Sequence, residues 1–223
     1  MNERLLTEDP LVEIEALRRQ SPASALSRLN DAPPELFARP EARLTQAELV
    51  HELRGPAAAR PLLVRLVAEF PNYCSAFHRL ARVHDELEDR VAALECRLAV
   101  HRLDTILDDA LEPCDETVID DDLSQTALEA LSLAPGWVRG RLTPVPLAWC
   151  GRPELQRVEQ GFDPRALAEL REVRASVVSP SSPRASLLTL VLYRTNLLAS
   201  ADDEKGLRQN LRVAIRELLE RMA

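Results

Sequence analysis

Aromatic residues, glycine and lysine are all scarce in this chain of 223 residues. Only 4% of the residues are aromatic, so leucine, alanine and valine must build the core, a composition that suits packed helices. The six glycines do not cluster, which argues against a glycine-rich loop that holds phosphate groups. Lysine occurs once, at Lys205, among 28 basic residues. This preference for arginine indicates codon bias rather than a functional choice.

The chain also lacks the patterns of a membrane, secreted or nucleic-acid-binding protein. It has no apolar run of about eighteen residues, the minimum for a membrane-spanning helix. Its first residues, "MNERLLTEDPLVEIEALRRQ", do not have the basic and then apolar segments of a secretory signal. The net charge of −8 argues against nucleic acid, because binding to phosphates needs a basic surface. We therefore expect a cytoplasmic protein that binds neither membranes nor nucleic acid.

No cofactor is expected from the cysteines and histidines. The four cysteines are widely separated and form no CxxC pair: Cys74, Cys96, Cys114 and Cys150. In an intracellular chain such residues are typically reduced thiols. Cys74 and His78 could share a helix face with Cys96 nearby, but His101 aligns poorly as a fourth ligand. Packing or surface roles are the commoner use of such residues, and we expect no metal. The sequence has no P-loop, Rossmann fingerprint, nucleophile elbow or HExxH motif.

The first half of the chain has the spacing of amphipathic helices. In residues 1–45 prolines divide the chain into an irregular helical segment, in which Asp9 and Ser21 are expected to cap helices that begin with proline. From 46 to 112 the apolar residues recur at spacings of three and four, as in antiparallel helices. Thr45 and Glu48 have the spacing of a capping box that would open the first of them, and Gly55 would end it. Asn72, after Pro71, is expected to cap a later one.

Residues 56–105 carry a repeat-like pattern. Pro71 closes one helix pair, Phe77 follows six residues later, and the small Ala93 falls in the second helix of the next pair. This pattern resembles a tetratricopeptide repeat, although the usual glycine and tyrosine positions are absent, and generic helical hairpins are the alternative. The resemblance implies a groove for a peptide. The residues that would face it are Ser75, His78, Arg82, Asp85 and Glu86.

An acidic segment then separates the helical first half from a region with both helix and strand patterns. Residues 103–138 contain no lysine or arginine, and the interval 113–121 is interpreted as an acidic linker. Asp122 is expected to cap the next helix. Residues 122–223 read as a small α+β domain. The expected strands are "RLTPVPLAW", confined to an edge by its prolines, "ASVVS", and a central "SLLTLVLYR". "RPELQRVEQ", "DPRALAELREV" and the last 22 residues read as helices, the last of them capped by Asp202 or Asp203.

The order of short motifs in this last region is the most specific feature of the sequence. "LVLYRTNLL" is followed by three acidic residues and a helix, and it is preceded by "ALEALSLAP", "TPVPLAW" and "FDPRALAEL". In this order the segments resemble the small bacterial metallopeptidases called minimal zincins. In that family the last helix carries HExxH, in which two histidines bind zinc and the glutamate acts as general base. The expected fold is thus α+β, with tetratricopeptide-like hairpins followed by a zincin-like domain.

The resemblance places a degenerate motif in the last helix. Its window is Arg216-Glu217-Leu218-Leu219-Glu220, so that Arg216 and Glu220 stand where the family has histidines. A permanent cation cannot bind zinc, and Glu217 alone does not make a site. Without the resemblance, Arg216, Glu217 and Glu220 read as an exposed helix face beside an apolar stripe formed by Leu207, Leu211, Ala214, Ile215 and Leu218.

Two functions follow as hypotheses. The first is a non-catalytic interaction protein, a scaffold or regulator, that binds a polar protein or peptide partner through its helical hairpins. The second is a metal-dependent hydrolase, such as a peptidase, with a site that the sequence does not reveal. Zinc retained by the purified protein would favour the second.

Overall fold

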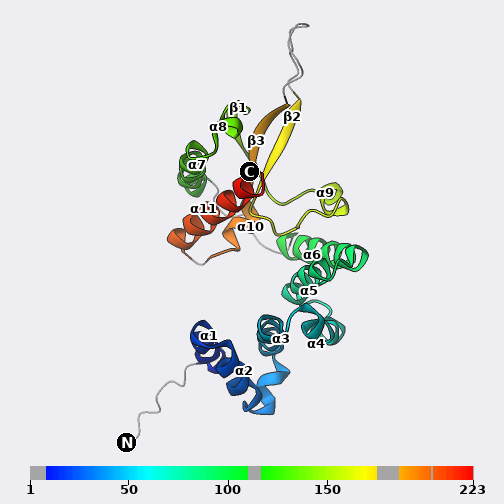
Figure 1. The fold of residues 1–223 in the computed structure, drawn as a ribbon. Helices are drawn as coiled ribbons and strands as arrows, with labels where there is room; N and C mark the ends of the chain where they lie inside the picture. The colour runs from blue at the N-terminus through cyan, green and yellow to red at the C-terminus, as the bar shows by residue number, and fades with distance from the viewer. Residues whose placement is uncertain (1–8, 110–116, 175–185, 202, 223) are drawn as a thin grey trace, which may run out of the picture. The chain divides into compact units, whose positions relative to one another are not determined.

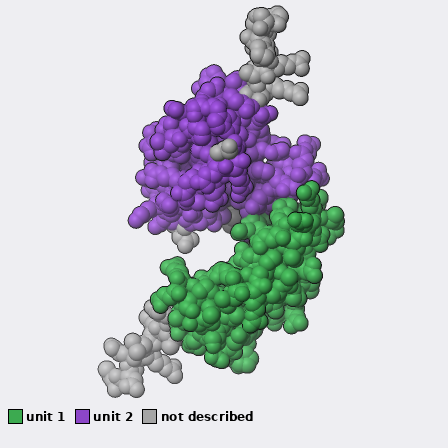
Figure 2. All heavy atoms as spheres, in the orientation of Figure 1, with its two compact units in different colours: residues 1–110 green, residues 111–223 purple. Residues whose placement is uncertain are grey.

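The architecture was derived from a computed structural model, which describes residues 9–109, 117–174, 186–201 and 203–222. The chain divides into two compact units, residues 1–110 and 111–223 (Figure 2). Unit 1 is helical in its described part, and unit 2 contains both helices and a sheet. The mixed helix-and-sheet class predicted from the sequence is therefore confirmed.

Unit 1 is a succession of helices, each packed against the next (Figure 1). They are α1 (Pro10–Gln20), α2 (Pro22–Asn30), the 3-10 helix η1 (Pro34–Ala38), α3 (Pro40–Arg54), α4 (Pro56–Glu69), α5 (Cys74–Glu86) and α6 (Arg90–Asp109). Local signals explain several ends. Asp9 accepts a hydrogen bond from Leu11 N at 3.1 Å, and Ser21 accepts one from Ser24 N at 3.2 Å, as predicted. Gly55, at φ +83°, ends α3 in a backbone conformation that favours glycine.

Small buried residues let the helices of unit 1 approach closely. One cluster joins α1, α2 and α3 around Ile14, Leu29 and Leu49, and another joins α3 to α6 around Leu63 and Leu66. Fully buried alanines lie at the helix contacts: Ala25, Ala42, Ala47, Ala59, Ala76 and Ala93. With few aromatic rings available, interdigitated leucines and alanines supply the buried apolar area.

Two expected helix starts in unit 1 are wrong. α3 begins at Pro40, so Thr45 lies buried inside the helix and does not cap it. The helix starts earlier because Pro40 has the fixed φ of a first helical position and needs no backbone donor there. Tyr73, not Asn72, occupies the N-cap position of α5.

Unit 2 is built on a three-stranded sheet with the order β1-β3-β2. Its elements are α7 (Thr117–Ser132), α8 (Gly136–Arg139), β1 (Leu142–Cys150), α9 (Leu155–Glu159), β2 (Ala168–Arg174), β3 (Ser186–Tyr193), α10 (Arg194–Leu198) and α11 (Glu204–Glu220). β3 is central, parallel to β1 and antiparallel to β2. The apolar run of β3 is buried and the prolines of β1 lie on an edge strand, so both predictions are confirmed.

Three expectations in unit 2 need correction or stay open. The end of "DPRALAELREV" is strand β2, not helix, because antiparallel pairing with β3 along Ala168–Arg174 overrides the helical preference of its Ala, Leu and Glu residues. α7 begins at Thr117, so Asp122 lies inside the helix and part of the expected linker is helical. The strand expected at 175–179 lies outside the described residues.

α11 closes the hydrophobic core of unit 2. Asp203 caps it by accepting from Gly206 N at 2.6 Å. Leu207, Leu211 and Ile215 are buried in a cluster with Leu190 and Leu192 of β3, so the predicted apolar stripe does pack on the sheet. α7 packs along α11 and completes the same cluster. Among the described residues, no helix is both long enough and apolar enough to cross a membrane.

Candidate functional site

The five residues expected to line a peptide groove lie on the solvent side of α5. None of them is buried, and Arg82, Asp85 and Glu86 are exposed. At 100° per residue they fall within one arc of the helix, opposite the buried Ala76, Leu80 and Val83. The exposed Arg82, Asp85 and Glu86 are therefore the part of this arc that solvent reaches most freely.

The two edges of that arc are held by neighbouring helices. Glu86 reaches α3, where its Oε2 lies 2.7 Å from His51 Nε2. Asp85 reaches the other way and pairs with Arg97 of α6. Between them Arg82 forms no ion pair with any other described residue. Arg82 is thus a cation with its charge free for a ligand.

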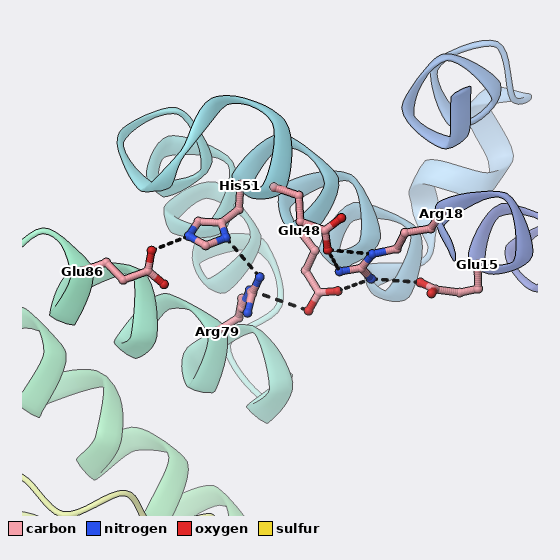
Figure 3. A network of polar contacts seen from close by, with 7 residues as sticks. Glu15, Arg18, Glu48, His51, Arg79 and Glu86 are labelled. Carbon is pink, nitrogen blue, oxygen red and sulfur yellow. Dashed lines mark hydrogen bonds and ion pairs between the residues drawn. The ribbon is translucent and has the colours of Figure 1, made fainter. Parts of the chain in front are cut away.

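A polar network continues this surface from α5 across α3 to α1 (Figure 3). Arg79 donates to His51 Nδ1 at 3.3 Å and lies 3.8 Å from Glu48 Oε1. Glu48 also accepts from Arg18 of α1 at 2.7 Å. Arg18 further contacts Glu15 and Glu52. We call these side chains, together with those of the α5 arc, the α1–α3–α5 face.

The contacts of the network fix the ring tautomer of His51 and stabilise the charge of Arg18. Arginine only donates, so His51 Nδ1 accepts from Arg79 and Nε2 carries the proton that is shared with Glu86. Partial burial opposes the charge of Arg18, but hydrogen bonds to Glu52 and Glu48 outweigh it and raise the pKa of Arg18. The face therefore presents a fixed pattern of charges from three helices.

In unit 2 the "LYRTN" residues hold the fold together. The Tyr193 hydroxyl donates to Glu169 Oε2 at 2.6 Å, and Glu169 also contacts Arg157 and Arg171. Asn196 Nδ2 donates to the carbonyls of residues 164 and 166 at 2.9 and 2.8 Å and so fixes the loop before β2. These buried contacts give the motif a structural role, independent of any catalytic one.

Arg216, Glu217 and Glu220, the positions that the zincin resemblance would assign to a degenerate motif, are exposed on α11, as the helix pattern predicts. Arg216 lies 3.9 Å from Glu220, and Glu217 lies 4.0 Å from Arg221. Arg216 and Glu220 also line a groove of about 670 Å³, which we call the α7–α11 groove. Its other lining residues are Glu129, Ala130, Leu133, Pro135, Gln209, Arg212, Val213, Ile215 and Leu219.

The cysteines and histidines weighed as metal ligands have other surroundings. Cys74 donates to Asp104 Oδ1 at 3.1 Å and faces the Val100 carbonyl at 3.7 Å. Cys96 is buried in the core, and burial raises the pKa of its thiol to about 11. In the part of the chain that the structure describes, no three His, Cys, Asp or Glu side chains are grouped so as to hold a metal ion.

Sequence reasoning missed the α1 and α3 part of the face. Glu48 was assigned to a capping box, and Arg18, His51 and Arg79 had no assigned role. The contacting residues are about thirty positions apart in the sequence. The one sequence signal that could have suggested the network is that these residues fall on the same side of their helices. No protein-family model, curated protein or solved structure matches this chain.

Proposed function

We propose that this chain is a non-catalytic interaction protein that holds a polar peptide on its α1–α3–α5 face. Unit 1 would serve as a tetratricopeptide-like platform, and unit 2 would be a zincin-like domain without zinc ligands. The observation that carries the proposal is the unbroken row of polar side chains from Arg18 through Glu48 and His51 to Arg79 and Glu86. The row is partly buried, with the side chains of Arg18, Glu48 and Arg79 only 20%, 24% and 15% exposed, so it joins the three helices and holds its charges in fixed positions.

The charges on the face indicate what the peptide should carry. Arg82 lacks an ion-pair partner among the described residues, so it suits a carboxylate of the peptide. Glu86 keeps one oxygen beyond its contact with His51, which suits a peptide N–H or basic group. A peptide with both acidic and donor groups therefore fits better than a purely apolar one.

Selection from a displayed random-peptide library tests the proposal. A selected peptide should bind Arg82→Ala at least tenfold more weakly, because a charge-assisted hydrogen bond contributes about 1.5–3 kcal/mol. Arg65→Ala is the matched control, since Arg65 is likewise exposed on α4 and forms no ion pair with a described residue. Titration calorimetry measures both. Equal binding to wild type and Arg82→Ala would contradict the proposed face.

Metal analysis separates this function from the hydrolase alternative. Under the proposal, protein purified without added zinc should contain far less than one zinc per chain. Stoichiometric zinc together with peptidase activity would favour a metal-dependent hydrolase instead.

A further inference from the structure

The α7–α11 groove has an apolar floor and a charged rim. Ala130, Val213 and Leu219 contribute partly exposed apolar side chains to its lining, and Ile215 lies buried beneath them. The charged residues are two arginines and two glutamates: Arg212, Arg216, Glu129 and Glu220. Both ion pairs are long, 3.6 Å for Arg212 with Glu129 and 3.9 Å for Arg216 with Glu220, and all four side chains are more than half exposed. Such pairs hold each other weakly and can exchange for better partners.

Leu133 is an apolar protrusion on the edge of the same groove. Its side chain is 86% exposed although it lines the groove. The turn that follows α7 holds it in place: Leu133 N donates to the Ala130 carbonyl at 3.2 Å, and the flanking Leu131 and Ala134 are buried. The turn therefore fixes the backbone of Leu133, and its apolar side chain extends into solvent at the edge of the groove.

The α7–α11 groove thus combines a protruding leucine, a concave apolar surface, and equal numbers of positive and negative side chains. A strongly acidic partner would be repelled by Glu129 and Glu220, and a strongly basic one by Arg212 and Arg216. A surface with the same balanced charges and its own protruding leucine avoids both penalties. A second copy of this chain supplies such a surface when the two grooves pair about a two-fold axis. The arginines of one copy can then lie against the glutamates of the other.

We propose that the α7–α11 groove is a homodimer interface, in which Leu133 of each copy enters the groove of the other. This inference does not depend on the peptide-binding function of unit 1. Burial of two exposed leucines and two apolar floors would supply the hydrophobic core of the interface, and the four charges of each copy its polar rim.

Light scattering with gel filtration on the full chain, at up to about 0.1 mM, tests the dimer. Wild type should show twice the chain mass of 24.9 kDa. Leu133→Asp should shift it to the monomer mass without loss of helical signal, because Leu133 is outside the core. Val91→Asp is the control, since Val91 is 71% exposed in unit 1 and should leave the dimer unchanged. A monomeric wild type, or a dimer that persists in Leu133→Asp, would overturn the proposal.

A charge exchange tests the self-complementary rim. Arg216→Glu leaves one arginine against three glutamates in each copy, so the dimer should dissociate roughly tenfold more easily. Arg216→Glu combined with Glu220→Arg restores the balance and should restore most of the affinity. Loss of affinity in the double variant equal to that in the single one would contradict a charge-balanced interface.

Discussion

At the scale of single residues, the carboxylate of Glu169 is almost completely buried. Its side chain is only 6% exposed, and it is held by the Tyr193 hydroxyl and by two arginines, Arg157 and Arg171. A buried charge is tolerated only when such partners satisfy it. The cluster links β2 to β3 and α9, so its hydrogen bonds contribute to the stability of unit 2.

Tyr193→Phe tests that contribution. The ring can remain in place against Phe162, whose centroid is 6.0 Å away, but Glu169 loses its closest neutral donor. The free energy of unfolding should fall by about 1–2 kcal/mol. Urea denaturation followed by circular dichroism measures the change. A stability equal to that of the wild type would show that the two arginines satisfy Glu169 without the hydroxyl.

The Tyr193 hydroxyl should also make the free energy of unfolding depend on pH in the alkaline range. Burial, and then the hydrogen bond to Glu169, raise the pKa of Tyr193 above its ordinary value near 10. Above about pH 10 the unfolded chain releases this proton while the folded chain keeps it, so the free energy of unfolding should fall with rising pH. Tyr193→Phe should show a shallower fall. Cys96, with a pKa raised to about 11, gives a slope of the same sign in both proteins, so the difference isolates Tyr193.

At the scale of elements, α11 divides its two sides between structure and surface. Its buried stripe of Leu207, Leu211 and Ile215 joins α7 to the sheet, whereas Arg216, Glu217 and Glu220 face solvent or the groove. Packing alone therefore explains why this helix forms without a metal. Because Arg216, Glu217 and Glu220 are exposed, substitutions at these positions should leave the fold intact.

Paired substitutions in α11 test this division. Ile215→Asp should destabilise unit 2 by several kcal/mol, about 4 or more, because it buries an unpaired charge at a fully buried position. Glu217→Gln should change the free energy of unfolding by less than about 0.5 kcal/mol, since Glu217 is exposed and its only described partner is Arg221 at 4.0 Å. Denaturation curves of both variants are the measurement. Loss of a measurable peptidase activity in Glu217→Gln would instead identify a working general base.

At the scale of the whole molecule, each unit contains its own hydrophobic clusters. Those of unit 1 draw on α1 to α6, and those of unit 2 on α7, α8, α11 and the sheet. A unit with its own core and with contacts between successive helices has what it needs to fold from local interactions. The two proposed surfaces, the α1–α3–α5 face and the α7–α11 groove, belong to different units and can be tested separately.

A fragment of residues 9–109 should fold by itself. Its contacts join each helix to the next, and its buried alanines and leucines supply the core. We expect strong helical circular dichroism and one cooperative unfolding transition in urea. Val91→Asp within the fragment is a neutral control, whereas Leu63→Asp should abolish the transition. A fragment without cooperative unfolding would show that unit 1 requires the rest of the chain.

Features that depend only on nearby residues could be predicted from the amino-acid sequence. The caps at Asp9, Ser21 and Asp203 are confirmed because a cap joins groups two or three positions apart. The central strand is confirmed because a run of large apolar residues predicts burial on both faces. The apolar stripe of α11 follows in the same way from helical periodicity.

Features that depend on residues far apart in the chain became clear only from the tertiary structure. Ala168–Arg174 has helical preferences but becomes a strand, because pairing with β3 satisfies its backbone groups along the whole segment. The α1–α3–α5 face requires Arg18, Glu48 and Arg79 to come together from three helices. The α7–α11 groove is likewise lined by residues of two helices that are far apart in the chain. No local pattern encodes these contacts, since their free energy arises only when packing has already set the helices side by side.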